Sequence, residues 1–156
     1  MIYVFDASSI VVLKNFYPSR FPSLWKSIDR LLQEKRLLST REVLNELQLR
    51  EGQDLILKWA DSNKHIFTVP TNEELQFVNR ILSVPHFRSL ISQESLLKGS
   101  PVADPFVIAA ARVKRGCVVT EEGRKINAAK IPNVCDHFRI ECTNMEGLMK
   151  REGWSF

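Results

Sequence analysis

Apolar and polar positions follow two different periods along the chain, and each change of period marks a boundary between expected elements. Residues 2–6 form a short apolar run with β-branched and aromatic side chains, which is typical of a buried strand. A short helix is expected over 7–14. Residues 23–35 and 39–50 carry apolar side chains three or four positions apart, which predicts helices with one buried face.

The same two patterns continue to the end of the chain. Further strands are predicted at 65–70, 117–120 and 140–142. Further helices are predicted over 53–64, 72–82, 86–98, 104–115, 133–138 and 144–151, with Gly116 as a plausible C-terminal cap of the long apolar helix. Strands separated by helices indicate an α/β fold with a mostly parallel sheet covered on both faces. One such unit accounts for residues 1–156, so we expect a single domain.

Composition narrows the class of protein only slightly. The 156 residues are 44% hydrophobic and 26% charged, which is ordinary for a globular domain in water. The formal net charge of +4 is compatible with a polyanionic partner. Cys117, Cys135 and Cys142 are odd in number and widely spaced, which favours reduced thiols and a cytoplasmic location. We expect no signal peptide and no membrane span, because no basic segment precedes the first apolar run and no long apolar stretch follows.

The first strand ends on a carboxylate, Asp6. Burying a carboxylate is costly unless it has a partner or lies at an opening. In α/β sheets that opening is just outside the carboxyl ends of the strands, where ligands bind. Asp6 is also a favoured residue type for capping a helix over 7–14. The stretch by itself therefore leaves two interpretations, a helix cap and a site residue.

Asp104 and Pro105 form a strong helix start, with Asp at the cap and Pro at the first helical position. A cap can still serve a second purpose, because one carboxylate oxygen accepts an amide hydrogen while the other faces a ligand. The motif alone predicts only that a helix begins here.

Two acids compete on the helix over 40–50. With Val43 at zero and about 100° per residue, Glu46 falls at about −60° and Glu42 at about −100°. Glu46 therefore lies on the shoulder of the apolar stripe, and Glu42 is expected to lie further into solvent. Either acid is otherwise a solvated helix residue, with Arg50 as an i,i+4 partner for Glu46.

The strand over 117–120 also runs into polar residues. Side chains alternate along a strand, so Thr120 and Glu122 are expected on one face and Glu121 on the other. An extra residue in a bulge would reverse this assignment.

Taken together, these stretches resemble the PIN-domain family, which includes the VapC-type toxins of bacterial and archaeal toxin–antitoxin pairs. The resemblance is carried by "FDASS", "VLNEL", "ADPFVIAAA" and "VVTEE". The tail, with "KIPNVCDHF" and "IECTNMEGLM", is similar to a PIN subfamily of uncharacterised small bacterial proteins. The resemblance implies a three-layer αβα sandwich, a cluster of carboxylates that holds Mg²⁺ or Mn²⁺, and metal-dependent cleavage of RNA.

Carried over residue by residue, the resemblance assigns catalysis and metal binding to four acids: Asp6, Glu46, Asp104 and Glu122. Ser8 and Thr120 match polar positions that orient these ligands. Glu122 departs from the pattern, because the family usually has Asp there. The longer side chain predicts a looser second metal site. The resemblance also implies an RNA substrate, a cognate antitoxin protein and a homodimer.

Five basic residues are candidate phosphate contacts because they lie in loops or at helix ends: Arg41, Arg115, Arg124, Lys125 and Lys130. Each of them is otherwise an ordinary solvated surface charge.

Three other interpretations stay open. A PIN-fold module that binds RNA or a partner without cleaving would share the fold, although all four acids are present. A phosphotransfer domain with Asp6 as acceptor would leave Glu46 and Asp104 unexplained. A zinc site built from Cys135, His137 and Cys142 lacks the paired spacing that makes such sites recognisable.

Overall fold

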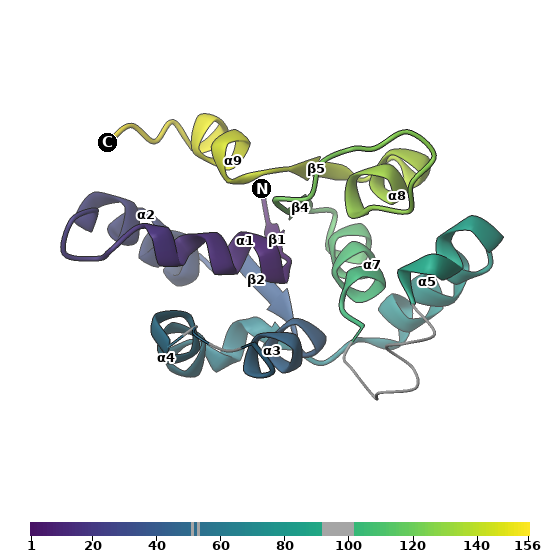
Figure 1. Cartoon of the computed structure of the whole chain (residues 1–156), viewed down its shortest axis with the longest axis horizontal. Coiled ribbons are helices and arrows are strands. Elements are labelled where there is room, and N and C mark those ends of the chain that lie inside the picture. Colours follow the sequence, from purple (N-terminus) through teal and green to yellow (C-terminus); the bar gives the residue numbers. More distant parts are fainter. Residues whose placement is uncertain (51, 53, 92–101) are drawn as a thin grey trace.

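The structure is a computed structural model and describes residues 1–50, 52, 54–91 and 102–156. These residues form a five-stranded sheet with the strand order β3-β2-β1-β4-β5, in which every neighbouring pair is parallel (Figure 1). The strands are β1 (Tyr3–Phe5), β2 (Leu37–Thr40), β3 (Phe67–Thr68), β4 (Cys117–Val119) and β5 (Glu141–Thr143).

Helices cover both faces of this sheet. The α-helices are α1 (Ala7–Val11), α2 (Pro22–Gln33), α3 (Arg41–Gln48), α4 (Asp54–Ser62), α5 (Asn72–Leu82), α7 (Asp104–Lys114), α8 (Ile131–Phe138) and α9 (Met145–Glu152). The 3₁₀ helices are η1 (Val12–Asn15), η2 (Lys64–Ile66) and η3 (Pro85–Leu90). In Figure 1, α1 and α2 lie on one side of the strands, and α5, α7 and α8 lie on the other. The predicted α/β sandwich with a parallel sheet is confirmed.

The helices begin where local chemistry favours it. Pro22 starts α2 at a position where its missing N–H costs no hydrogen bond. Thr71 and Glu74 form a reciprocal capping box at the start of α5. The middle of α7 is buried on almost every side, because it packs against the sheet and against both α5 and α8. Its alanines permit that close approach.

The central strands supply the middle of the core. Val4 and Phe5 of β1, like Val118 and Val119 of β4, are completely buried. Removing such a side chain from water contributes about 1.5–3 kcal/mol. These two strands are therefore held firmly in register, which fixes the positions of the residues that follow them.

The turn from α7 into β4 differs from the prediction. Arg115, and not Gly116, is the C-terminal cap, and it adopts a left-handed conformation with φ of 52°. Gly116 is needed for another reason, since a Cβ there would lie 2.7 Å from the carbonyl oxygen of Ile2. The close approach allows the Cys117 amide to donate to the same oxygen, at 2.8 Å.

Three other elements differ from the sequence pattern. Strand β2 is absent from the predicted elements, because its last two residues, Ser39 and Thr40, fall within the helix predicted over 39–50. Thr40 does cap α3, accepting a hydrogen bond from the Val43 amide at 3.3 Å. The strand expected over 65–70 is reduced to the two residues of β3. The helix expected over 86–98 begins as the 3₁₀ helix η3, and residues 92–98 lie outside the described residues.

In the described part of the chain, every helix is too short or too polar to cross a bilayer.

Candidate functional site

The Asp6 carboxylate is buried and held by hydrogen bonds on both oxygens. Thr120 Oγ1 donates to Oδ2 at 2.6 Å, and Ser8 Oγ lies 2.8 Å from Oδ1 and 2.9 Å from Oδ2. The backbone amide of Ser9 also donates to Oδ1, at 2.8 Å. Asp6 therefore caps α1 and presents a fixed carboxylate at the end of β1, so the two interpretations of this residue are compatible.

Strand register brings these groups together. Phe5 of β1 pairs with Val119 of β4, so the next residues, Asp6 and Thr120, leave the sheet side by side. The Asp6 amide donates to the Val119 carbonyl at 3.1 Å, which continues the pairing by one step. Residues 112 positions apart thus meet, since Ser8 Oγ lies 3.3 Å from Thr120 Oγ1.

Asp104 reaches the same edge from α7. This helix ends where β4 begins, so it runs against the strand direction and starts at their carboxyl ends. Burial, followed by the charges of Glu122, Asp6 and Glu46, raises the pKa of Asp104 to about 7. The structure thus gathers the carboxylates of strand ends, a helix face and a helix start.

The expectation that Asp104 caps its helix is wrong. The cap residue is Ala103, which has no side chain able to accept the hydrogen bond, and Asp104 is the first helical residue. Pro105 at the next position explains why this start is stable without a side-chain cap. The Asp104 carboxylate therefore lies among the other acids and is not used in helix capping.

The relative exposure of Glu42 and Glu46 is also opposite to the prediction. Glu42 is only 8% exposed, and it pairs with Arg41 at 2.9 Å. Glu46 is half-buried and pairs with Arg50 at 2.8 Å. The buried arc of α3 extends from Glu42 to Leu47, because the helix packs against β2, β3, α1 and α4 together. An assignment based on the apolar residues alone puts the centre of the buried face too close to Leu44, which is only half-buried.

Glu42 is therefore a buried acid, although the sequence pattern predicts that it lies in solvent. Its Oε2 atom is buried without a hydrogen-bond partner among the described residues. The charge of Glu46 is among the causes that raise the pKa of Asp104, so Glu46 lies near the cluster.

The side chains of Glu121 and Glu122 accept hydrogen bonds from the starts of different helices. Glu122 Oε2 accepts a hydrogen bond from the Ile131 amide at 3.0 Å, at the start of α8. Glu121 Oε1 accepts one from the Met145 amide at 2.8 Å, at the start of α9. The charge of Glu122 is the largest charge effect that raises the pKa of Asp104.

A pocket of about 300 Å³ adjoins this edge of the sheet, beyond β4 and β5. It is lined by Thr120, Glu122, Gly123, Arg124, Pro132, Cys142, Thr143 and Asn144. Arg124 is engaged in a bidentate ion pair with Asp136, at 2.8 and 3.0 Å, which lowers the pKa of Asp136. The pocket wall is therefore polar, and its arginine already has a carboxylate partner.

The candidate phosphate contacts do not gather at the cluster. The charge of Lys130 lowers the pKa of Asp104, so this lysine lies near the carboxylates. Arg41 pairs with Glu42 and Arg124 with Asp136, while Lys125 is exposed in the loop before α8. Arg115 follows the C-terminal end of α7, at the opposite edge of the sheet.

With this geometry established, comparison with known proteins gives the family. Residues 3–156 match the family described as "Domain of unknown function (DUF4411)". The chain belongs to the DUF4411 family. A search of curated proteins gave no match. The family description assigns no activity, so any function of this DUF4411 chain has to be argued from its residues.

The carboxylates fit a hard cation in chemistry but are not already arranged around one. Mg²⁺ and Mn²⁺ prefer carboxylate oxygens, and an uncompensated cluster of acids is relieved by a cation. However, no three histidine, cysteine or acidic side chains of the described chain lie together in a metal-binding group. Glu46 and Glu122 hold Arg50 and the Ile131 amide instead. Each of these contacts involves one carboxylate oxygen, which leaves the other oxygen of each glutamate as a possible cation ligand.

The cysteines and His137 of this DUF4411 chain have other partners. The Cys135 and Cys142 thiols interact with each other, which raises the pKa of Cys135 and lowers that of Cys142. His137 packs edge-on against Phe87, with ring centroids 5.0 Å apart. These contacts give no support to the alternative of a zinc site.

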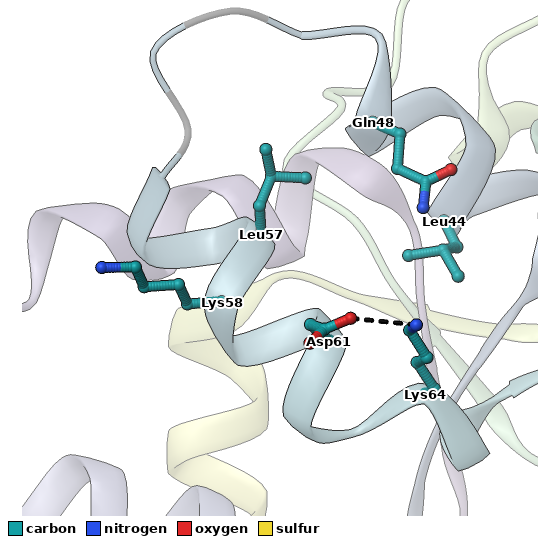
Figure 2. Close-up of a pocket in the computed structure, with 6 residues that line it drawn as sticks. All are labelled: Leu44, Gln48, Leu57, Lys58, Asp61 and Lys64. Carbon is teal, nitrogen blue, oxygen red and sulfur yellow. Dashed lines mark ion pairs between the residues drawn. The ribbon is translucent and has the colours of Figure 1, made fainter.

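A larger hollow of about 370 Å³ lies between α3 and α4 (Figure 2). Leu44, Gln48, Leu57, Lys58, Asp61 and Lys64 line it. Asp61 pairs with Lys64 at 3.0 Å, so this carboxylate is neutralised. The hollow is larger than the polar pocket beside the carboxylates, but it lacks their chemistry.

Proposed function

We propose that this DUF4411 chain is a Mg²⁺- or Mn²⁺-dependent endoribonuclease of the PIN type. The observation that carries the proposal is the convergence of Asp6, Glu46, Asp104 and Glu122 at the carboxyl edge of a parallel sheet, with Asp6 held by Ser8 and Thr120. Packing alone does not favour three acids close enough to Asp104 to raise its pKa. A site for a divalent cation and an anionic substrate accounts for them.

In this proposal the residues have distinct roles. Asp6 and Asp104 are the principal ligands, because Asp6 is buried at the end of β1 and burial is the largest cause of the raised pKa of Asp104. Glu46 either binds the cation or orients the attacking water, and Glu122 belongs to a second, weaker position. Ser8 and Thr120 hold the Asp6 carboxylate in orientation. When bound, the divalent cation supplies hydroxide at neutral pH and neutralises charge on the leaving oxygen.

The biological setting is proposed from the PIN resemblance alone. It comprises a toxin acting in the cytoplasm on RNA, inhibited by a cognate antitoxin, and a homodimeric assembly. The net charge of +4 supports a polyanionic substrate.

A second candidate function is a PIN-fold module that binds RNA or a partner with little or no cleavage. A specific observation favours it: Glu46 and Glu122 are engaged with Arg50 and with the start of α8. If these contacts persist in solution, each glutamate offers only one carboxylate oxygen to a cation, which weakens a second metal position.

The deciding experiment is cleavage of an unstructured, end-labelled RNA by the purified chain with Mg²⁺ or Mn²⁺, with and without EDTA. Glu122→Gln is compared with Glu121→Gln. Each glutamate accepts a hydrogen bond from the backbone amide at the start of one helix, and the side-chain oxygen of glutamine can still accept it. We expect EDTA to abolish cleavage. Glu122→Gln should slow it at low metal concentration, and Glu121→Gln should be nearly silent.

Cleavage that persists after exhaustive chelation would refute the metal-dependent mechanism. If no cleavage occurs with either metal, while the wild-type chain binds the RNA in a gel-shift assay, the binding module replaces the nuclease.

A further inference from the structure

Four arginines gather at the amino edge of the sheet, opposite the carboxylates. Arg112 lies in the last turn of α7 and Arg115 follows it, Arg139 follows α8, and Arg80 lies in the last turn of α5. Two hollows of about 200 and 250 Å³ both include Arg112 and Arg139 in their linings. Arg115 lines the first hollow and Arg80 the second. The two hollows therefore adjoin, and we call the surface made by Arg80, Arg112, Arg115 and Arg139 the arginine edge.

Helix direction explains part of this arrangement. In Figure 1, α5, α7 and α8 lie on the same side of the sheet. The partial negative charge at the C-terminal end of a helix favours a cation. This effect accounts for the cations at the ends of α7 and α8. It does not account for Arg80 at this edge, because the first turn of α5 lies beside the end of α7, where Glu74 pairs with Lys114.

Two of these arginines occupy backbone positions that usually favour glycine. Arg115 and Arg139 have φ of 52° and 56°, in the left-handed region, where a residue with a Cβ is strained. Arginine is therefore not the residue that the backbone by itself would select at either cap.

The carboxylates near the arginine edge are engaged elsewhere. Glu74 pairs with Lys114, and Glu141, which lines the first hollow, pairs with Arg151. Within the part of the chain that the structure describes, no ion pair involves any of the four arginines. All four side chains are exposed. The edge thus presents positive charge that these carboxylates do not balance.

Aromatic rings support two of the guanidinium groups. Arg80 lies 5.8 Å from the Phe77 ring centroid and 5.7 Å from that of Phe138, and Arg112 lies 5.8 Å from Phe77. A guanidinium on an aromatic ring keeps N–H donors available for a phosphate, which it can bind in a bidentate manner.

We propose that the arginine edge binds the phosphate backbone of RNA away from the carboxylates. This proposal rests on RNA being the substrate of the proposed function. A nucleic acid fits better than an acidic protein, because protein interfaces are anchored by buried aromatic and aliphatic groups. Phe77 and Phe138 line the second hollow but are buried or half-buried. Among the described residues, none of the exposed large apolar side chains lines either hollow. The chemistry offered is charge and hydrogen-bond donors.

The geometry sets a minimum length for an RNA that reaches both edges. Asp104 begins α7 and Arg115 follows its last residue, so the helix rise separates them by about 16 Å. At about 3.4 Å per stacked nucleotide, at least roughly five nucleotides are needed to extend from one edge to the other.

The test is RNA binding in EDTA, so that no cleavage intervenes. Fluorescence anisotropy is measured over a range of salt concentrations with a labelled, unstructured RNA of about 16 nucleotides. The variant Arg112→Gln/Arg139→Gln should bind roughly tenfold more weakly at low salt, with a slope of log affinity against log salt that is shallower by about 1.4. Arg112→Lys/Arg139→Lys should largely retain the wild-type slope, because it retains both charges.

The matched control is Lys14→Gln/Arg20→Gln, which removes the same charge from exposed positions near α2. It should keep the wild-type affinity and slope, and the melting temperature of each variant verifies folding. Equal losses in the control and the Arg112/Arg139 pair would overturn the arginine edge. Arginine-dependent binding of poly-glutamate, with RNA binding unaffected, would also overturn it.

Cleavage of the same RNA with Mn²⁺ separates this proposal from the proposed function. A wild-type chain that binds through these arginines but never cleaves supports the arginine edge and removes the nuclease. A chain that cleaves, while the Arg112/Arg139 variant binds like the control, supports the nuclease and removes the arginine edge.

Discussion

The two edges of the sheet carry opposite charges, and α7 connects them. At the carboxyl edge, Asp104 begins the helix among Asp6, Glu46 and Glu122. At the amino edge, the helix ends at arginines that line two hollows. Acids at a helix start and bases at its end are what the helix dipole favours.

At the carboxyl edge, other effects overcome the dipole. A helix start stabilises a carboxylate by about 0.3–1 kcal/mol, which would lower its pKa. The pKa of Asp104 is instead raised from 3.8 to about 7. A shift of that size corresponds to about 4 kcal/mol. Burial and neighbouring acids therefore dominate at this edge, whereas the arginines at the amino edge remain solvated.

The largest effect is expected at Asp6. Asp6→Asn should reduce RNA cleavage by at least about 10³-fold, because a neutral amide binds a divalent cation poorly. The fold should be retained, since the asparagine oxygen can still accept the Ser9 amide hydrogen bond. Cleavage rates and melting temperatures of the two proteins test this. A variant that loses activity only because it unfolds would leave Asp6 as a helix cap and nothing more.

The second prediction concerns pH and Asp104. The pKa of this group is higher in the folded chain than its ordinary value of 3.8, so folding favours the protonated form. Its contribution to stability is complete below pH about 4 and is lost as the pH rises through about 7. Asp104→Asn removes this dependence. In EDTA at pH 8 it should raise the free energy of unfolding by at most about 4 kcal/mol relative to wild type.

Urea unfolding of both proteins at pH 5 and pH 8 measures this difference. Added Mn²⁺ should stabilise wild type at pH 8 and stabilise Asp104→Asn much less. If the two proteins have parallel pH profiles, the Asp104 carboxyl is ionised normally and the cluster is looser than described.

The third prediction separates the two glutamates of α3. Glu46→Gln should slow cleavage by roughly 10–100-fold, because Glu46 faces the cluster and its charge acts on Asp104. Glu42→Gln should leave the cleavage rate within about twofold of wild type. Steady-state rates at saturating Mn²⁺ give the comparison. A larger loss at Glu42 would show that its buried, unpartnered oxygen belongs to the site.

The smallest effect is expected at the amino edge. Arg139→Gly relieves a left-handed cap and should stabilise the fold by about 0.5–1 kcal/mol. The same change should weaken RNA binding in EDTA, so stability and binding move in opposite directions. Thermal unfolding and anisotropy measure the two quantities. Loss of both stability and binding would indicate that the arginine side chain serves only the fold.

The candidate site could be predicted where a residue follows directly from a strand. The apolar runs ending at Asp6 and at Val119 are visible in the sequence, and parallel pairing then places Asp6 beside Thr120. The helix face of Glu46 could not be settled in this way. Its burial depends on β2, β3, α1 and α4 together, and the wheel of α3 alone misplaced Glu42.

By itself the sequence determined the order of most strands and helices, the parallel α/β class and the acids at strand and helix ends. These properties depend on local periodicity and on residues next to one another in the chain. Only the tertiary structure decided that Arg115 takes the left-handed cap while Gly116 admits the Ile2 backbone. It also decided that Glu121 and Glu122 accept hydrogen bonds from the starts of different helices. The shared hollows lined by arginines of α5, α7 and α8 were likewise decided only there. Such features depend on contacts between segments far apart in sequence, about which the local pattern carries no information.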